Sequence, residues 1–211
     1  MLNQLRKCLA VTCLSVAFFN ANAAPIVSDI TGGNEFDSYY GSSAGDVIGF
    51  AFTADVDLTA TALGLWIGND GVLNSSHQVG LWDLVSQNLL GSVIVDNNDQ
   101  LVDSFRYADL TSALQLTAGT SYVLGAMIAA GDGDTYISGP SSVTTSNITI
   151  LNAVFPDAVD LGFVFPTSVT QSLGRFGPNM LADQTVANDV PAPGAFALLV
   201  LSLGLLKIRR G

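Results

Sequence analysis

Apolar residues in this 211-residue chain recur in short runs, several of which alternate apolar and polar positions. Such runs, rich in Val, Ile, Phe, Tyr and Thr, are typical of β-strands, whereas an amphipathic helix repeats its apolar positions every three to four residues. The middle of the chain shows no convincing helical pattern. The predicted strands are 47–53, 60–67, 78–84, 89–95, 101–107, 121–129, 135–138 and 148–155.

The segments between these runs are rich in Asp, Asn and Gly, the residues that tight turns favour. Short strands at this spacing indicate an all-β fold, an antiparallel β-sandwich of jelly-roll-like form, and we assign it to residues 24–189. From about residue 174 to 189 the pattern fades. This last part is either a final strand or an exposed stalk.

Two strand-sized motifs, Leu63-Gly64-Leu65-Trp66 and Val79-Gly80-Leu81-Trp82, are alike. We expect them to form neighbouring antiparallel strands, with the glycines giving room for close packing. Because side chains alternate along a strand, one set of residues would face the core. That set is Leu63, Leu65, Ile67, Val79 and Leu81. Trp66 and Trp82 would then face the other side, where they either pack inside the protein or stack on sugar rings as glycan-binding residues.

The N-terminus has the layout of a secretory signal peptide over residues 1–23. Arg6 and Lys7 form a basic start, 8–19 an apolar helix-forming run, and Ala21 and Ala23 the small residues of a cleavage site for signal peptidase. The alternative is an N-terminal signal anchor. Export would place the body of the protein outside the cytoplasmic membrane.

The C-terminus, residues 190–211, has three parts in order. Val190-Pro191-Ala192-Pro193 precedes an uncharged apolar run over 194–206, and the chain closes with the basic residues Lys207, Arg209 and Arg210. As a helix this run is about 20 Å long, short of a bilayer core of about 30 Å. The basic end favours retention on the cytoplasmic side. The alternative is a buried C-terminal helix of a soluble domain.

A Pro-containing tetrapeptide, a short apolar helix and a basic end, coupled to a signal peptide, resemble the PEP-CTERM sorting tail of Gram-negative bacteria. The resemblance implies an exosortase partner, a membrane-embedded cysteine protease that cuts near the Pro-rich motif and releases or transfers the body. The protein would be held briefly in the cytoplasmic membrane and then reach the cell surface or the medium. In one departure, Ala192 stands where the family usually has Glu.

The middle of the chain also resembles a known type. The peptides Gly49-Phe50-Ala51-Phe52-Thr53, 61–66, 76–83, 105–107 and 116–125 are similar to a β-sandwich domain of unknown function found in many PEP-CTERM proteins. This resemblance spans about 100 residues and implies a fold and an extracellular setting. It brings no ligand with it.

Charge and cysteine content narrow the function classes. Residues 24–189 hold two arginines, Arg106 and Arg175, against all 18 acidic residues, which gives a net charge of −16. A body so poor in cations cannot neutralise a phosphate backbone, and this excludes nucleic acid as a partner. Cys8 and Cys13 both lie in the signal peptide, so the mature protein has no disulfide.

A hydrolase is the alternative function. Gly41-Ser42-Ser43-Ala44-Gly45 matches the spacing of a nucleophile elbow with Ser43 as nucleophile, and His77 is the only histidine of the chain. The elbow chemistry needs a turn from strand to helix, however, and here a strand follows. A pair among the many carboxylates could also serve a glycosidase. Ordinary turn residues and a hydrogen-bonded histidine account for the same pattern.

Asp132 and Asp134, in the turn Gly131-Asp132-Gly133-Asp134, are candidate ligands for Ca²⁺, which prefers oxygen ligands. Asp and Asn are also common in hairpin turns, and the chain lacks the spacing of an EF-hand. We expect no other cofactor. Taken together, the sequence predicts an exported structural or glycan-binding protein of the cell surface or extracellular matrix, with extracellular polysaccharide as a candidate partner, and not an enzyme.

Overall fold

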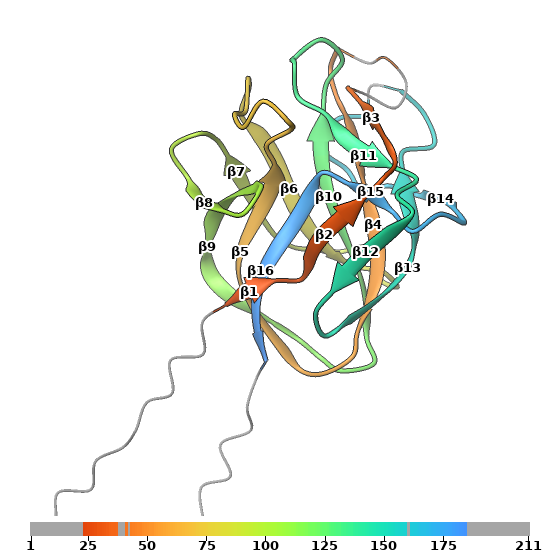
Figure 1. Cartoon of the computed structure of the whole chain (residues 1–211). Coiled ribbons are helices and arrows are strands. Elements are labelled where there is room, and N and C mark those ends of the chain that lie inside the picture. The colour runs from red at the N-terminus through yellow and green to blue at the C-terminus, as the bar shows by residue number, and fades with distance from the viewer. Residues whose placement is uncertain (1–22, 38–40, 42, 160, 185–211) are drawn as a thin grey trace, which may run out of the picture.

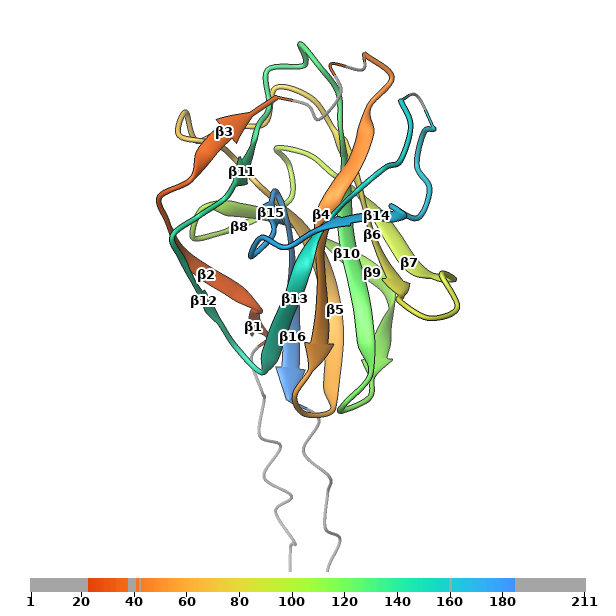
Figure 2. The same cartoon turned by 90° about the vertical axis from the view of Figure 1, so that its right-hand side faces the viewer.

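Two antiparallel β-sheets pack face to face in the computed structural model, which describes residues 23–37, 41, 43–159 and 161–184 (Figures 1 and 2). The described residues form strands and no helix, so the all-β prediction of an antiparallel sandwich is confirmed. None of the described segments contains a helix long and apolar enough to cross a membrane. The signal peptide and the sorting tail lie outside the described residues, apart from Ala23.

The larger sheet has six strands. In order across the sheet they are β14 (Ser168–Thr170), β13 (Ile148–Phe155), β4 (Asp46–Ala54), β10 (Ser121–Ile128), β6 (His77–Asp83) and β7 (Leu89–Val95). The facing sheet has five strands, in the order β1 (Ala24–Pro25), β16 (Pro178–Gln184), β5 (Leu58–Trp66), β9 (Phe105–Leu116) and β8 (Gln100–Val102). The segment after residue 174, predicted as either a final strand or a stalk, therefore contains a strand that ends at Gln184 and lies between β1 and β5 in the five-stranded sheet.

Two small sheets cover parts of this sandwich. One contains β15 (Arg175–Phe176), β11 (Tyr136–Ser138) and β3 (Asn34–Phe36), and the other pairs β12 (Ser142–Thr145) with β2 (Val27–Thr31). In Figure 1, β2 and β12 lie in front of the sandwich, beside β16.

The main core fills the space between the two large sheets. From β4 it takes Ile48, Phe50 and Phe52, which are completely buried. Leu63 and Leu65 of β5 and Val79 and Leu81 of β6 belong to the same core, together with Ile67. The predicted inner face is thus confirmed. Each such side chain stabilises the fold by about 1.5–3 kcal/mol when fully buried, which matters in a body without cysteines.

One part of the prediction was wrong. β5 and β6 are not neighbouring strands, because β5 pairs with β16 and β9 while β6 pairs with β10 and β7. The two Leu-rich motifs instead lie in opposite sheets and both contribute to the main core. Alternation along each strand sets which face is buried, but it carries no information about which strand lies next to which.

The outer faces of both sheets are covered where the tryptophans lie. Trp66, on the five-stranded sheet, packs with Phe105 and Tyr107 below Ile30 of β2. On the six-stranded sheet, Trp82 packs in a cluster with Phe163 and Phe165, from the segment that follows β13. The sandwich therefore has a second and a third apolar layer outside its main core.

The glycines beside the tryptophans make this outer packing possible. A Cβ added to Gly64 would lie 2.4 Å from the ring of Tyr107, and one added to Gly80 would lie 2.7 Å from Phe163. Both distances are too short for any side chain. The prediction that these glycines allow close packing is therefore confirmed.

Candidate functional site

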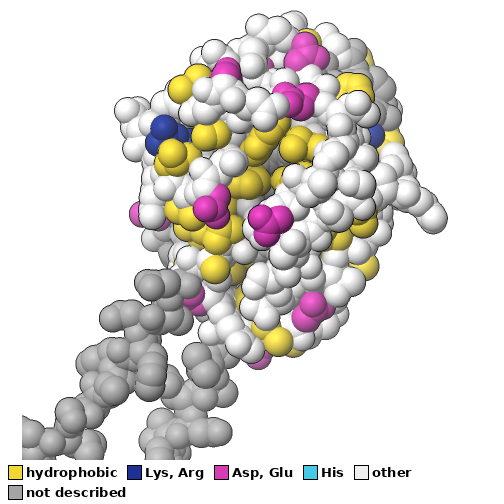
Figure 3. Space-filling view, viewed as in Figure 1, with side chains coloured by type: hydrophobic (Ala, Val, Ile, Leu, Met, Phe, Trp, Pro, Cys, Tyr) yellow, Lys and Arg dark blue, Asp and Glu magenta, His cyan; other side chains and the backbone are white. Residues whose placement is uncertain are grey.

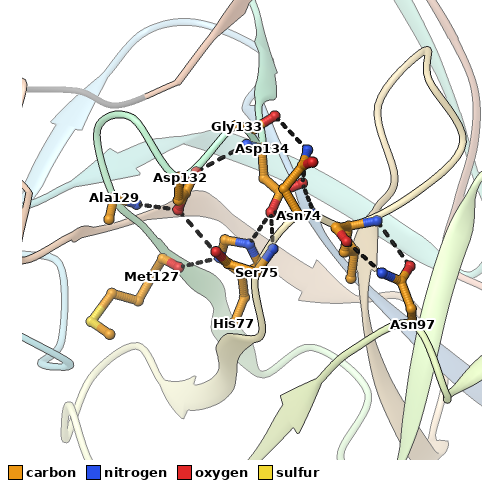
Figure 4. A network of polar contacts seen from close by, with 10 residues as sticks. Asn74, Ser75, His77, Asn97, Met127, Ala129, Asp132, Gly133 and Asp134 are labelled. Atoms are coloured by element: carbon orange, nitrogen blue, oxygen red, sulfur yellow. Dashed lines mark hydrogen bonds and ion pairs between the residues drawn. The ribbon is translucent and has the colours of Figure 1, made fainter.

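The polar network around His77 connects two loops to the six-stranded sheet (Figure 4). His77 begins β6, and Asp132 and Asp134 come from the loop that follows β10. The loop folds through glycines in left-handed conformation, Gly131 at φ 79° and Gly133 at φ 89°. Asp132 stabilises this turn, because its carboxylate accepts hydrogen bonds from the backbone N–H groups of Ala129 and Asp134.

Both ring nitrogens of His77 face acceptors. Nε2 lies 2.8 Å from Oδ2 of Asp134, and Nδ1 lies 3.0 Å from the carbonyl oxygen of Met127. A carbonyl oxygen accepts only, and an ionised carboxylate accepts only, so both nitrogens must carry hydrogen to satisfy these contacts. The geometry therefore fits a doubly protonated imidazolium, only 3% exposed, paired with a buried carboxylate.

The pKa of His77 reflects a competition. Burial opposes the charged form and lowers the pKa, but the hydrogen bonds to Asp134 and to Met127, with the charges of Asp134 and Asp132, outweigh it and leave the pKa raised. The Nδ1 atom is 4.0 Å from Oδ2 of Asp132. The surroundings of the ring thus favour its charged form.

Asp134 is the matching partner. Burial raises the pKa of Asp134. The hydrogen bonds from His77 and from the backbone N–H groups of Asn74 and Ser75 outweigh this effect, so the pKa is lowered overall. These backbone groups lie 2.9–3.0 Å from the carboxylate oxygens. A single buried carboxylate therefore ties the loop before β6 to the loop after β10, and Asn74 strengthens the link by donating to the carbonyl of Gly133.

This group could hold a metal ion. One nitrogen of His77 and one carboxylate oxygen each from Asp132 and Asp134 lie within 4.8 Å of one another. A nitrogen ligand with two carboxylates resembles the donor set that zinc accepts, whereas Ca²⁺ takes six to eight oxygens. The imidazolium would have to lose a proton before it could act as a ligand, so metal and proton compete for the same nitrogen.

The structure does not place His77 as the base of a Ser43 nucleophile. Ser43 is exposed in the loop before β4. In a Ser-His-Asp triad one imidazole nitrogen faces the acid and the other faces the serine. Here His77 has the acid on Nε2, but the backbone carbonyl of Met127 occupies Nδ1.

The two tryptophans do not form an exposed sugar platform. Trp66 is 7% exposed and Trp82 is 3% exposed. The ring of Trp82 lies 5.1 Å from that of Phe163, centroid to centroid, at 42°. Stacking on a sugar needs a free ring face, and the outer layers remove it. Of the two alternatives for these rings, packing inside the protein is confirmed and stacking on sugars is wrong, because the faces opposite the core are covered by other segments.

The residues predicted for signal-peptide cleavage and for sorting lie outside the described part of the chain, apart from one. Ala21, Val190, Pro191, Ala192, Pro193, Lys207, Arg209 and Arg210 are not described, and Ala23 is the first described residue. The signal-peptide and tail assignments stay predictions.

Comparison with known proteins adds no assignment. No model of a known protein family matches this chain, and no curated protein matches it significantly. The resemblances of the tail and of the sandwich therefore also stay predictions.

Proposed function

We propose that this chain is an exported β-sandwich protein, sorted and processed by an exosortase through its C-terminal tail, and that its body is a structural or glycan-binding module of the cell surface or extracellular matrix. Signal peptidase would remove residues 1–23. The tail would hold the protein in the cytoplasmic membrane until it is cut.

The observation that carries the proposal is the pairing of the first strand with the last. In β1 and β16, Ala24 is opposite Ala182 and Pro25 is opposite Leu181. The described chain thus enters and leaves the sandwich at one end. Attachment through the tail at this end leaves the distant loops and the outer surface of the sandwich free for contact with other molecules.

The network at His77 argues against this histidine as a general base. A general base needs a nitrogen free to receive a proton from the nucleophile. The ring of His77 instead makes two structural hydrogen bonds, to Asp134 and to the backbone of Met127. We therefore keep the hydrolase, with Ser43 and His77 or with a carboxylate pair, as the less favoured alternative.

Mass spectrometry tests the sorting half of the proposal. In a Gram-negative host with an active exosortase, we expect the mature protein to lack residues 1–23 and most of residues 190–211. The same host without the exosortase is the control, and there the tail should stay intact. A mature protein that ends at Arg210-Gly211 in both hosts would contradict the proposal.

A charge reversal tests how the tail is retained. Replacing Arg209 and Arg210 by Asp removes the basic end that favours the cytoplasmic side. We expect less of the uncut protein in the membrane fraction. Unchanged fractionation would count against the predicted orientation.

Calcium is the specific metal ion that we propose for the group at His77, Asp132 and Asp134. Asp132 and Asp134 offer carboxylate oxygens in one glycine-rich loop. A cation bound there would tighten the loop at the free end of the sandwich. Melting temperatures in calcium chloride and in sodium chloride of equal ionic strength test this proposal.

A further inference from the structure

A cleft opens on the outer side of the five-stranded sheet, between β2 and the turn that joins β8 to β9. Its volume is about 600 Å³, within the range of about 300–1,000 Å³ that is usual for small-molecule sites. Figure 3 shows a hollow on this face, with hydrophobic side chains inside it and acidic side chains around it. The sequence gives no continuous motif for this cleft, since its residues come from four separate segments.

The floor of the cleft is apolar and firmly held. Trp66 and Phe105 line it and belong to the outer apolar layer, with Ile30 and Ile137 packed against them. Only 7% of Trp66 and 5% of Phe105 is exposed, so a ligand would meet only a small part of each residue. A floor of this kind is already formed and loses little conformational freedom when a ligand binds.

The rim is polar and acidic. Asp29 of β2 and Asp103 of the turn between β8 and β9 line it, together with Asn69 from the loop after β5. Both aspartates have left-handed backbone conformations, with φ 44° at Asp29 and φ 53° at Asp103. Asp29 lies where the register of β2 against β12 shifts, and such bulges redirect side chains. Asp103 begins the two-residue turn of a hairpin, a position that Asp tolerates.

The composition of the lining narrows the class of ligand. No Lys, Arg or His is among the described residues that line the cleft, and two carboxylates repel anions, so phosphates, nucleotides and acidic sugars do not fit. A purely apolar ligand would leave the polar rim without partners. Neutral sugars match both parts, because their hydroxyl groups donate to carboxylate and amide oxygens while their C–H faces contact apolar surface.

We propose that this cleft binds an uncharged segment of extracellular polysaccharide. The inference rests on the proposed function and deepens it, since it places glycan binding at a cleft lined by Trp66, Asp29, Asn69 and Asp103. Trp82, on the other large sheet, has no part in it.

Fluorescence titration of the purified chain tests the assignment. The chain contains two tryptophans, and a Trp82→Phe background leaves only Trp66, at the floor of the cleft, as reporter. The probes are neutral hexasaccharides of β-1,4-glucose, β-1,3-glucose and α-1,6-glucose, a glucosamine hexamer as cation, and an oligogalacturonate as anion. We expect a saturable change in Trp66 emission with at least one neutral probe and none with the anion.

Substitutions in the cleft locate the binding. Ser104 is exposed and lines the cleft, so Ser104→Trp, monitored by isothermal titration, should fill it and weaken binding at least tenfold. Ser92→Trp, at an exposed position of β7, is the matched control and should leave affinity unchanged. Asn69→Ala and Asp103→Asn are milder changes that should each weaken binding several-fold. They keep the test valid if Ser104→Trp does not fold.

Each other outcome overturns the inference in a distinct way. No binding of any neutral probe, or binding of the glucosamine hexamer alone, would refute the ligand class. Neutral binding that survives Ser104→Trp, Asn69→Ala and Asp103→Asn would refute the cleft while leaving a glycan-binding body in place. Tail processing is measured separately, so failure of the sorting proposal is not confused with failure at the cleft.

Discussion

His77 gives a clean probe of stability at the scale of single residues, because the chain has no other histidine. Its pKa in the folded protein is raised above the usual value of 6.5, so the folded state binds this proton more tightly than the unfolded state does. The resulting stabilisation is complete below pH 6.5 and is lost as pH rises through the folded pKa. We therefore expect the free energy of unfolding to fall above pH 6.5.

Urea unfolding between pH 5.5 and 9 measures this slope. His77→Gln should remove most of it, because the carboxylates are already ionised in this range. In an NMR titration, Asp134→Asn should lower the pKa of His77 more than Asp132→Asn does, since Asp134 makes the 2.8 Å contact and Asp132 lies 4.0 Å away. A slope that persists in His77→Gln would show that another group titrates.

The same pair also predicts a limit at acid pH. The pKa of Asp134 is lowered in the folded protein, so its contribution is present above the usual value of 3.8 and disappears as pH falls through the folded pKa. The ion pair is therefore most stabilising between about pH 4 and 6.5. The sequence pointed to Asp134 and to His77 separately, but 57 residues separate them, and only the pairing of β6 with β10 brings them together.

At the scale of the strand, burial on both faces decides the cost of substitutions. Leu65 is fully buried in the main core, and Leu65→Ala should cost about 2–5 kcal/mol. Trp82 is buried in the outer layer, so Trp82→Ala should cost about 3–5 kcal/mol, as for a core residue. Ser92→Ala, on an exposed position of β7, is the control and should change the free energy of unfolding by less than about 0.5 kcal/mol. A small effect of Trp82→Ala in urea unfolding would contradict the outer packing.

Glycines in the strands lead to a related prediction. Gly64→Ala would place a methyl group 2.4 Å from the ring of Tyr107, and the neighbouring ring would have to move. Overpacking of this kind costs about 1–3 kcal/mol. Thermal unfolding should show a lower melting temperature, and an unchanged one would mean that the outer layer yields easily.

Alternation along the sequence located the central strands well, because each buries a face against the core. β7 and β13 have the predicted bounds, and the ends of β4, β5, β6 and β10 lie within two residues of the predicted ones. The pattern predicts one strand over 101–107, but Asp103 and Ser104 form a turn within it, and β9 then continues to Leu116. The short covering strands β2, β3 and β12 had no clear signal, since they pack on outer faces that alternation assigns to solvent.

At the scale of the whole molecule, charge dominates the response to solution conditions. The body carries two arginines and 18 acidic residues and has no disulfide, so its folded state repels itself. Screening lengths fall from about 30 Å at 0.01 M salt to about 10 Å at 0.1 M. We expect sodium chloride to raise the melting temperature over this range. A melting temperature that does not respond to salt would contradict this account of the charge.

Calcium should do more than screen if it binds at Asp132 and Asp134. A cation that binds only the folded state stabilises it by mass action, which adds to any effect of ionic strength. We expect millimolar calcium chloride to raise the melting temperature more than sodium chloride of equal ionic strength, and Asp132→Asn to remove only the excess. Asp157→Asn removes the same charge from an exposed position and should leave the excess intact.

Because the imidazolium of His77 repels a cation, the excess should also grow as pH rises and the ring loses its proton. Equal effects of the two salts at every pH would leave screening as the whole explanation and remove calcium from this loop.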